Sequence, residues 1–489
     1  MNFDYIFWED IPKEEFIIQQ TENTGSEAIL TFSRDENYRL ICNIKTPPGY
    51  HAGWDNNFGK GRKAGELFSD IRKIEAITRH GHLMAKVEIF STSWKSWSPK
   101  EIIYEIEAQK IALHRKINSN NDDRTIEYFF LSNMSKGRIH FPSSISFETS
   151  GKAKIRMADT IDDTIEIPML SSYSYGCFKM EINGKKFILG KVDKKDINGV
   201  FLRFERENFP TDSELLIIKT FLGYITGSEI IEIGYTKFGQ NYSINEQVFI
   251  STFRNDIKAI ICEIPMPVIP LDLKIVGNRG VVITGEDKLT TLLSKYAGKR
   301  DTFYLDYIFY YIKCFRRVSM DIQMQPLATA LDIIQKAYFK NGDSHSKGRY
   351  LDDDEFKGII LKYSALINSD LNGCPHKDRI VAKINRANEF TLNDRCDIFF
   401  TEIGLKIGEF EKEVIRQRHR SIHGDLGNTD YQKLLFLVNG AYALLNRIIL
   451  KLIEYEGGYI DYSTYDYPIR NIEEPLGGIV INESKQQSS

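Results

Sequence analysis

The sequence predicts an α+β protein of two domains: a β-rich N-terminal domain over residues 1–283, then an all-α helical bundle over residues 284–456. The chain has 489 residues, more than one hydrophobic core usually spans. Short apolar runs separated by turn residues fill its first part, whereas apolar residues three and four apart fill the second. We expect residues 457–489 to form an extended or disordered tail, because they are rich in tyrosine and acids and then polar.

The β-rich part is predicted from runs of branched and aromatic residues such as AILTFS, RLICNI, AKVEIF, IEYFFLS and KFILGKV. Asn183–Gly184 and Asn198–Gly199 supply the residues that tight turns between strands require. One helix interrupts the strands. It begins at Asp212, carries an acidic first turn and ends at Gly227.

Helical spacing of apolar residues dominates from about residue 284 to residue 456. The predicted helices are Lys288–Tyr296, Phe303–Val318, Leu327–Lys340, Asp353–Ile367, Lys377–Asn388, a segment around Phe399–Leu405, Phe410–His423 and Tyr431–Tyr455. Turn residues in the linker NGDSHSKGR, residues 341–349, indicate a mobile loop between two of them.

Composition indicates a soluble cytoplasmic protein. The six cysteines are scattered, which is typical of reduced thiols. The acidic, aromatic N-terminus does not resemble a signal peptide, and the uncharged stretch Leu434–Asn446 is too short to cross a bilayer, so we expect no membrane association. The net charge is −3, so any nucleic-acid binding must depend on a local basic patch.

The segment EKEVIRQRHRSIHG, Glu411 to Gly424, concentrates basic side chains on one predicted helix. It contains Arg416, Arg418, His419, Arg420 and His423. Cations near a helix C-terminus are favoured by the macrodipole, by about 0.3–1 kcal/mol each, which accounts for part of this charge. It does not account for three arginines and two histidines within eight positions, so the segment is the candidate catalytic site.

This segment resembles the motif of the HEPN superfamily of metal-independent ribonucleases, an arginine, usually followed by a polar residue, and a histidine after four to six intervening positions. Here His419 follows Arg418, and four residues separate Arg418 from His423. The predicted position, on a late helix before one last long apolar helix, also resembles the family. The resemblance implies that Arg418 and His423 are catalytic, and we expect Arg416, His419 and Arg420 to bind phosphate.

The order of domains resembles the ApeA-like branch of this superfamily, in which a β-rich domain precedes the HEPN domain. Phe209–Ile230 resembles the late helix of that first domain, and Gly65–Trp94 resembles its early strands. The resemblance implies abortive-infection defence against phage. The expected substrate is RNA, with tRNA as one candidate, and a phage-derived trigger would act on the N-terminal domain.

The expected chemistry follows from RNA itself, which carries its nucleophile as the 2′-OH. Cleavage needs a base for that proton, an acid for the leaving 5′-oxygen and positive charge for the phosphorane. Histidine can serve as acid or base near neutral pH, and arginine holds phosphate with a planar fork. We therefore expect no metal and no other cofactor, and products that end in a 2′,3′-cyclic phosphate and a 5′-OH.

One chain carries one such motif, so the resemblance implies a homodimer through the helical domain with a shared cleft. Helix geometry leaves the pairing of His423 open. Arg416 lies seven positions before it on nearly the same face, whereas Arg418 lies five before it and is turned by about 140°. Both arginines remain candidates.

Other candidate sites have simpler structural interpretations. His80 and His82 could bind a metal, but a surface turn is favoured, and the same holds for Cys374-Pro375-His376. Asp352, Asp353 and Asp354 could hold a metal, but the first turn of a helix is favoured. The basic loop Gly59–Gly65 could touch RNA or a phage component, and Trp94 and Trp97 could stack on bases, although solvation and burial are favoured. The aromatic helix Phe303–Val318 could pack in the core or in a dimer interface.

Two other functions compete with the nuclease. One is a non-catalytic HEPN-like module that binds RNA or a partner protein as a sensor. The other is a carbohydrate- or peptide-binding β-protein with a helical dimerisation tail. The presence of both Arg418 and His423 favours the enzyme.

Overall fold

The computed structural model describes residues 11–19, 28–46, 72–97, 102–115, 123–134, 143–148, 152–156, 166–168, 174–194, 197–239, 244–252, 256–271, 286–320, 322–341, 348–422 and 430–478. Within these ranges some side chains are not described, among them those of residues 90–97 and 418–422. The chain divides into two compact units. One comprises Met1–Pro267 with Leu271–Thr290, and the other comprises Val268–Pro270 with Thr291–Ser489. The predicted order, a β-rich region and then a helical region, is confirmed.

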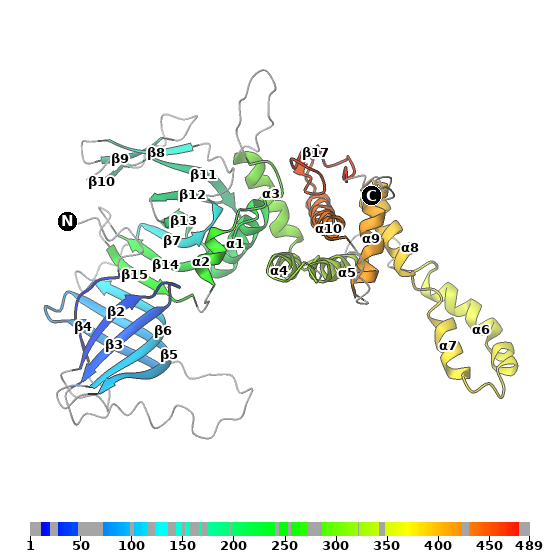
Figure 1. The fold of residues 1–489 in the computed structure, drawn as a ribbon, viewed down its shortest axis with the longest axis horizontal. Coiled ribbons are helices and arrows are strands. Elements are labelled where there is room, and N and C mark those ends of the chain that lie inside the picture. The colour runs from blue at the N-terminus through cyan, green and yellow to red at the C-terminus, as the bar shows by residue number, and fades with distance from the viewer. Residues whose placement is uncertain are drawn as a thin grey trace, which may run out of the picture. The chain divides into compact units, whose positions relative to one another are not determined.

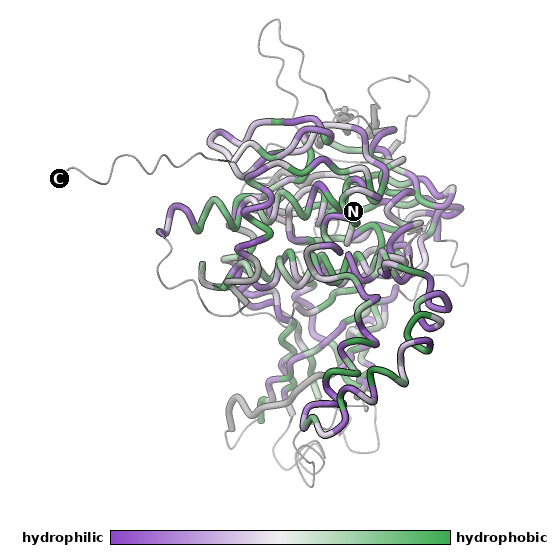
Figure 2. Tube along the Cα trace, turned by 90° about the vertical axis from the view of Figure 1, so that its right-hand side faces the viewer, coloured by the Kyte–Doolittle hydropathy of each residue, from purple (hydrophilic) through white to green (hydrophobic). Residues whose placement is uncertain are grey.

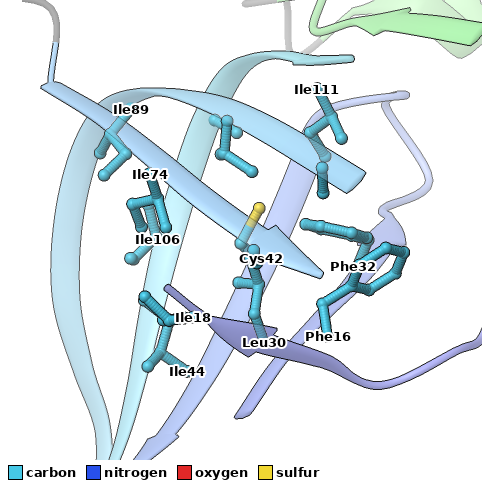
Figure 3. Packing of buried hydrophobic residues seen from close by; sticks show 14 of the residues in the cluster. Phe16, Ile18, Leu30, Phe32, Cys42, Ile44, Ile74, Ile89, Ile106 and Ile111 are labelled. Carbon is cyan, nitrogen blue, oxygen red and sulfur yellow. The ribbon is translucent and has the colours of Figure 1, made fainter. Parts of the chain in front are cut away.

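The first six strands of the N-terminal unit close into an antiparallel barrel. They are β1 (Phe16–Ile18), β2 (Ile29–Arg34), β3 (Leu40–Thr46), β4 (Arg72–Thr78), β5 (Leu83–Trp97) and β6 (Ile102–Arg115). Their order is β6-β3-β2-β1-β4-β5, and β5 pairs again with β6. Alternate residues of β6 are buried, as expected when one face of a strand lines a core. Figure 3 shows such side chains, including Phe16, Leu30, Cys42 and Ile106, gathered inside the barrel.

The sheet continues from β6 through a further series of antiparallel strands. These are β7 (Thr125–Ser132), β8 (Ser143–Glu148), β9 (Lys152–Arg156), β10 (Glu166–Pro168), β11 (Ser174–Ile182), β12 (Lys185–Lys194), β13 (Ile197–Glu205), β14 (Ile230–Phe238) and β15 (Ile244–Ile250). Their order away from β6 is β15-β14-β7-β13-β12-β11-β8-β9-β10. The predicted turn at Asn183–Gly184 joins β11 to β12, and both residues have positive φ. The turn predicted at Asn198–Gly199 is wrong, because both residues lie in β13 and pair with β12.

Helix α1 (Asp212–Thr226) is the helix predicted to interrupt the strands. Thr211 and Glu214 form a reciprocal capping box at its start, and Gly227 ends it in a left-handed conformation. A β-carbon at Gly227 would lie 1.9 Å from the Met266 carbonyl oxygen, so glycine is required there. The short helices η3 (Arg206–Asn208) and α2 (Ile257–Cys262) were not predicted.

The C-terminal unit contains the predicted helices with adjusted ends. They are α3 (Glu286–Lys299), which belongs to this unit from Thr291, α4 (Leu305–Phe315), α5 (Met324–Asn341), α6 (Asp353–Asp370), α7 (Lys377–Asn385), α8 (Leu392–Glu402), α9 (Glu409–Ile422) and α10 (Tyr431–Leu452). Along the trace in Figure 2, hydrophobic and hydrophilic residues mix within helices, as amphipathic helices require. Helix α4 buries Leu305, Ile308 and Phe309 and exposes Tyr307 and Tyr310. Only one face of this helix therefore packs in the core.

The expectation of an extended or disordered tail is wrong for residues 457–478. Strands β16 (Gly458–Ile460) and β17 (Ile469–Asn471) pair as a hairpin. Tyr459, Asp461 and Ser463 are fully buried and Ile472 is almost so. The tail is folded because each buried polar group has a partner: Asp461 accepts hydrogen bonds from Arg470 Nε at 2.6 Å and from the Gly477 N–H at 2.8 Å. Residues 479–489 lie outside the described part.

Helix α10 extends beyond the uncharged stretch Leu434–Asn446 at both ends. Over 22 residues it is long and apolar enough to cross a bilayer by length and composition. However, 83% of its most apolar stretch is buried inside the fold, as in the central helix of a globular bundle.

Candidate functional site

Helix α9 carries four of the five predicted site residues. Glu409 and Glu411 occupy its first turn, where the helix dipole favours acids, and the basic residues follow toward its C-terminal end. Arg416, Arg418, His419 and Arg420 all lie within the helix. The side chains of Arg418, His419 and Arg420 are not described, and His423 lies outside the described residues. The prediction of a shared cleft built from these side chains therefore stays a prediction.

One face of α9 packs into the bundle against α5 and α10. The buried residues Glu411, Val414 and Gln417 recur every three positions and define this face. Arg416 lies on the other side, with 68% of its side chain exposed, and pairs with Glu413 at 3.4 Å. Glu413 also accepts a hydrogen bond from Gln417 Nε2 at 2.9 Å. Because an exposed surface pair of this kind contributes little, Arg416 is available to an incoming phosphate.

The backbone of α9 separates the two arginine positions that compete for His423. Position 418 follows Glu411 by seven residues and Val414 by four, so its Cα lies on the stripe of the helix that packs inward. Position 419 follows the exposed Arg416 by three and lies on the outward side. The helix geometry therefore makes Arg416 as strong a candidate for the phosphate contact as Arg418.

The N-terminal end of α9 is fixed to α10 by a fully buried ion pair. Arg447 Nη1 donates to Glu411 Oε1, and both side chains are completely buried. Arg447 Nη2 also donates to the Ile472 carbonyl at 2.9 Å and to the Lys406 carbonyl at 3.3 Å. The Arg447 guanidinium lies 5.3 Å from the centre of the Tyr459 ring. One arginine thus ties α10 to α9 and to the C-terminal hairpin.

The second carboxylate oxygen of Glu411 accepts a hydrogen bond from the Gly408 N–H at 2.7 Å. The buried Glu411–Arg447 pair and its hydrogen bonds are called the clamp below. Burial raises the pKa of Glu411, and the charge of Arg447 opposes that rise. A buried carboxylate with a charged partner and backbone donors is held in one geometry. The clamp therefore fixes where the basic end of α9 points.

Sequence reasoning missed this clamp, although one signal was present. Arg447 interrupts the apolar run of α10, from Leu437 to Leu450, where a charge is costly unless it has a buried partner. Its partner Glu411 was treated only as part of the basic segment. The backbone carbonyl groups of Lys406 and Ile472 could not be predicted from the sequence as partners of Arg447, because every residue has a carbonyl group.

The C-terminal unit also contains a cavity of about 300 Å³ away from α9. It is lined by Lys295, Gly298, Lys299, Thr302, Phe303, Asn341 and Glu454. Lys295 lies 3.5 Å and Lys299 lies 3.9 Å from the Glu454 carboxylate. This carboxylate neutralises part of the lysine charge in the cavity.

The alternative candidates take mainly structural roles. His80 and His82 lie at the turn between β4 and β5, and His82 contacts Thr78 and Glu14 at 3.2 Å each. Asp352 caps α6, and Asp353 and Asp354 occupy its first turn, as favoured. No group of three or more possible metal ligands is found among the described residues.

Two further candidates fall on residues or side chains outside the described part of the structure. Loop Gly59–Gly65 lies outside the described residues, and the side chains of Trp94 and Trp97 on β5 are not described.

At the basic end of α9, the described side chains include one exposed cation, Arg416. Cations cluster there at a helix C-terminus, and a histidine follows the last helical residue in the sequence. Arginines can hold a phosphodiester while histidine moves a proton. Comparison with known proteins found no matching family model, no matching curated protein and no matching solved structure.

Proposed function

We propose that this chain is a metal-independent RNA endonuclease of the HEPN type. In this proposal Arg418 and His423 are the catalytic pair, and Arg416, His419 and Arg420 bind phosphate. The observation that supports it best is the exposed Arg416 on a helix that the buried Glu411–Arg447 pair holds in place. The same helix carries Arg418, and the sequence places His423 one position after its last residue.

The proposed reaction uses the 2′-OH of RNA as nucleophile. His423 takes the 2′ proton as the 2′-oxygen bonds to phosphorus, and a second histidine donates a proton to the departing 5′-oxygen. Arginine side chains balance the charge that develops on the phosphorane oxygens. The products are a 2′,3′-cyclic phosphate and a 5′-OH, and the protons balance over the step.

The second histidine comes from a second chain, because the motif occurs once in the sequence. The active species in this proposal is a homodimer whose two copies of Arg418 and His423 share one cleft. The N-terminal unit would sense a phage-derived trigger, and cleavage of cytoplasmic RNA, tRNA among it, would abort the infection.

The deciding experiment incubates purified protein with total RNA and maps the cut sites and end groups. We expect His423→Ala to abolish cleavage. The matched control is His376→Ala, because His376 is an exposed histidine in the turn before α7. Near-normal cleavage by a folded His423→Ala protein would overturn the assignment. Cleavage that needs added Mg²⁺ or Mn²⁺ and stops in excess EDTA would point to another mechanism.

The two arginine candidates are separated by single substitutions. Arg416→Ala and Arg418→Ala should both weaken cleavage if both side chains reach phosphate. The variant that lowers kcat with KM unchanged identifies the arginine that acts in the transition state. If RNA binds tightly but no condition gives cleavage, the runner-up, a non-catalytic RNA- or protein-binding sensor module, replaces the enzyme.

A further inference from the structure

Helices α6 and α7 form a helical hairpin, here called the arm, within residues 349–389. The two helices contact each other and lie side by side in Figure 1. The half-buried residues of α6, Phe356, Ile360 and Ile367, recur four and seven apart and form one stripe. Neither helix contains a single buried residue, although α6 alone is 18 residues long.

The arm rises from a fixed base. The side chain of Asn388 is bonded to both the N–H and the carbonyl of Leu351, at 2.8 and 2.9 Å. The Tyr350 N–H donates to the Asn388 carbonyl at 3.1 Å, and the Phe390 N–H donates to the Gly348 carbonyl at 3.1 Å. Because Asn388 is buried, these bonds are shielded from water. These hydrogen bonds therefore hold the two ends of the arm together at its base.

A second apolar stripe on α6 has no cover among the described residues. Ile359, Tyr363 and Leu366 are 42%, 47% and 61% exposed and lie four and three positions apart. They are adjacent on the helix to the stripe formed by Phe356, Ile360 and Ile367. Green residues recur among purple ones along the arm, which is nearest to the viewer in Figure 2. A helix with apolar residues on two adjacent stripes is typical of a bundle of more than two helices.

The charges of the arm fit a second copy of the arm better than a nucleic acid. Residues 349–389 contain seven acidic and seven basic side chains, so no net positive charge attracts a polyanion. The charges are also unevenly distributed. The base holds five acids, Asp352 to Glu355 and Glu389, against three cations, of which Arg349 and Lys357 pair with Asp353 and Asp354. The outer half holds four cations, Lys362, Lys377, Arg379 and Lys383, against Asp370 and Asp378. Two arms packed antiparallel would place each basic outer half beside the acidic base of the other.

We infer that the arm is a homodimerisation element, in which two arms pack antiparallel into a four-helix bundle. The bundle buries Ile359, Tyr363 and Leu366 of both chains. It also places the basic outer half of each arm beside the acidic base of the other. An interface of this type is self-complementary, as two-fold symmetry requires. The inference rests on the proposed function in one respect only: the dimer would bring two copies of α9 into one assembly.

The first test compares two exposed leucines of the same helix in the full-length chain. Leu361 is 73% exposed and lies away from the stripe, whereas Leu366 belongs to it. We expect Leu366→Lys to raise the dimer dissociation constant at least about tenfold, which corresponds to about 1.4 kcal/mol. We expect Leu361→Lys to leave it unchanged. Sedimentation equilibrium measures both, and helical circular dichroism confirms that α6 remains folded.

The second test reverses charges and does not depend on apolar substitutions. Chains with Asp354→Lys and Glu355→Lys, and chains with Arg379→Glu and Lys383→Glu, should each dimerise poorly, because like charges then face each other. An equal mixture should form heterodimers, because the reversed charges complement each other again. Normal dimerisation of each variant alone, or a mixture no better than either, would overturn the antiparallel arrangement.

The outcomes separate this inference from the nuclease proposal, because dimerisation is measured without RNA. A wild-type chain that is monomeric at micromolar concentration overturns the arm interface, whether or not it cleaves RNA. A dimer that Leu366→Lys disrupts, but that cleaves no RNA, supports the interface and overturns the nuclease. Loss of RNA binding in a Leu366→Lys variant of a monomeric protein would identify the arm as an RNA-binding surface instead.

Discussion

Arg447 is the residue on which the candidate site depends most within one chain. Arg447→Met leaves the Glu411 carboxylate buried without its charged partner, because the side chain of Glu411 is fully covered. Removing one partner of a buried ion pair typically costs about 3–5 kcal/mol. We expect the helical unit to lose stability by that amount. RNA cleavage should fall with it, because the basic end of α9 is then no longer held.

The distribution of tryptophan allows the two units to be followed separately. Trp8, Trp54, Trp94 and Trp97 are the only tryptophans, and all belong to the N-terminal unit. In urea, fluorescence therefore follows the N-terminal unit, and circular dichroism at a helical wavelength reports mainly the C-terminal unit. Arg447→Met should shift the second transition only. A Glu411→Leu, Arg447→Met double variant should recover part of the loss, and no recovery would contradict the ion-pair explanation.

Glu214 makes the stability of the N-terminal unit depend on pH in the acidic range. Burial opposes its ionisation, but hydrogen bonds from Lys185, the Thr211 N–H and Asn183 outweigh burial and lower the pKa of Glu214 to about 2. A lowered pKa stabilises the fold above the unfolded pKa of about 4.5, and this contribution is lost as pH falls toward 2. The shift corresponds to roughly 3 kcal/mol at neutral pH.

The corresponding variant is Glu214→Gln. It should lower the free energy of unfolding at pH 7 and flatten the decline between pH 4.5 and pH 2, followed by tryptophan fluorescence in urea. Glu207→Gln, at an exposed glutamate shortly before α1, is the matched control and should change neither quantity. Equal acid sensitivity of wild type and Glu214→Gln would contradict the assignment.

Among single residues, the sequence predicts those whose role is local. The acids at the start of α6 and the turn glycine at Gly227 follow from helix ends alone, and both are confirmed. The partner of Arg447 lies 36 positions away along the chain. No periodicity connects such positions, so the buried pair could not be predicted. The roles of Arg418 and His423 stay predictions.

At the scale of elements, periodicity located each helix of the C-terminal unit that the structure describes, with errors mainly at the ends. Helix α8 begins at Leu392, earlier than predicted, because the Thr391 hydroxyl accepts the Asp394 N–H and caps it. The closed barrel was not predicted, because closure depends on which distant strands pair. The tail was mistaken for disorder because its buried groups are tyrosines and an aspartate rather than an apolar run.

The C-terminal hairpin should be required for the stability of α9. A chain that ends after Tyr455 lacks Tyr459 and Ile472, which cover and bind Arg447. We expect its helical transition in urea to shift to lower denaturant concentration and its RNA cleavage to fall. A chain that ends after Gly478 keeps both contacts and is the matched control. Equal stability of the two truncated chains would contradict a structural role for the hairpin.

At the scale of the whole molecule, the division into units defines the fragment that should fold alone. Val268 and Ile269 are buried residues of the C-terminal unit, and the Ile460 N–H donates to the Val268 carbonyl at 3.1 Å. We therefore expect residues 268–478 to fold as an independent helical unit. A fragment of residues 284–470 lacks Val268 and Ile472 and should be less stable in urea. Equal stability would show that these segments contribute nothing.

A shared site predicts complementation between chains. Arg418→Ala chains and His423→Ala chains should each be inactive, and exchanged mixtures should recover part of the activity, because one arginine and one histidine remain in the common cleft. Recovery should disappear when both chains also carry Leu366→Lys, since the arms would no longer associate. A fully active, stable monomer at nanomolar concentration would rule out the shared site.

The pairing of β6 has a consequence for how the N-terminal unit opens. Along one edge, β6 pairs with β3 through Ala108 and then with β15 from Lys110, while β5 covers its other edge. All of its amides can therefore exchange with deuterated solvent only when both the barrel and the open sheet have opened. We expect them to be among the slowest-exchanging amides of the unit, with protection equal to its global unfolding free energy. If the N-terminal unit is a sensor, a change at this strand would affect the barrel and the open sheet together.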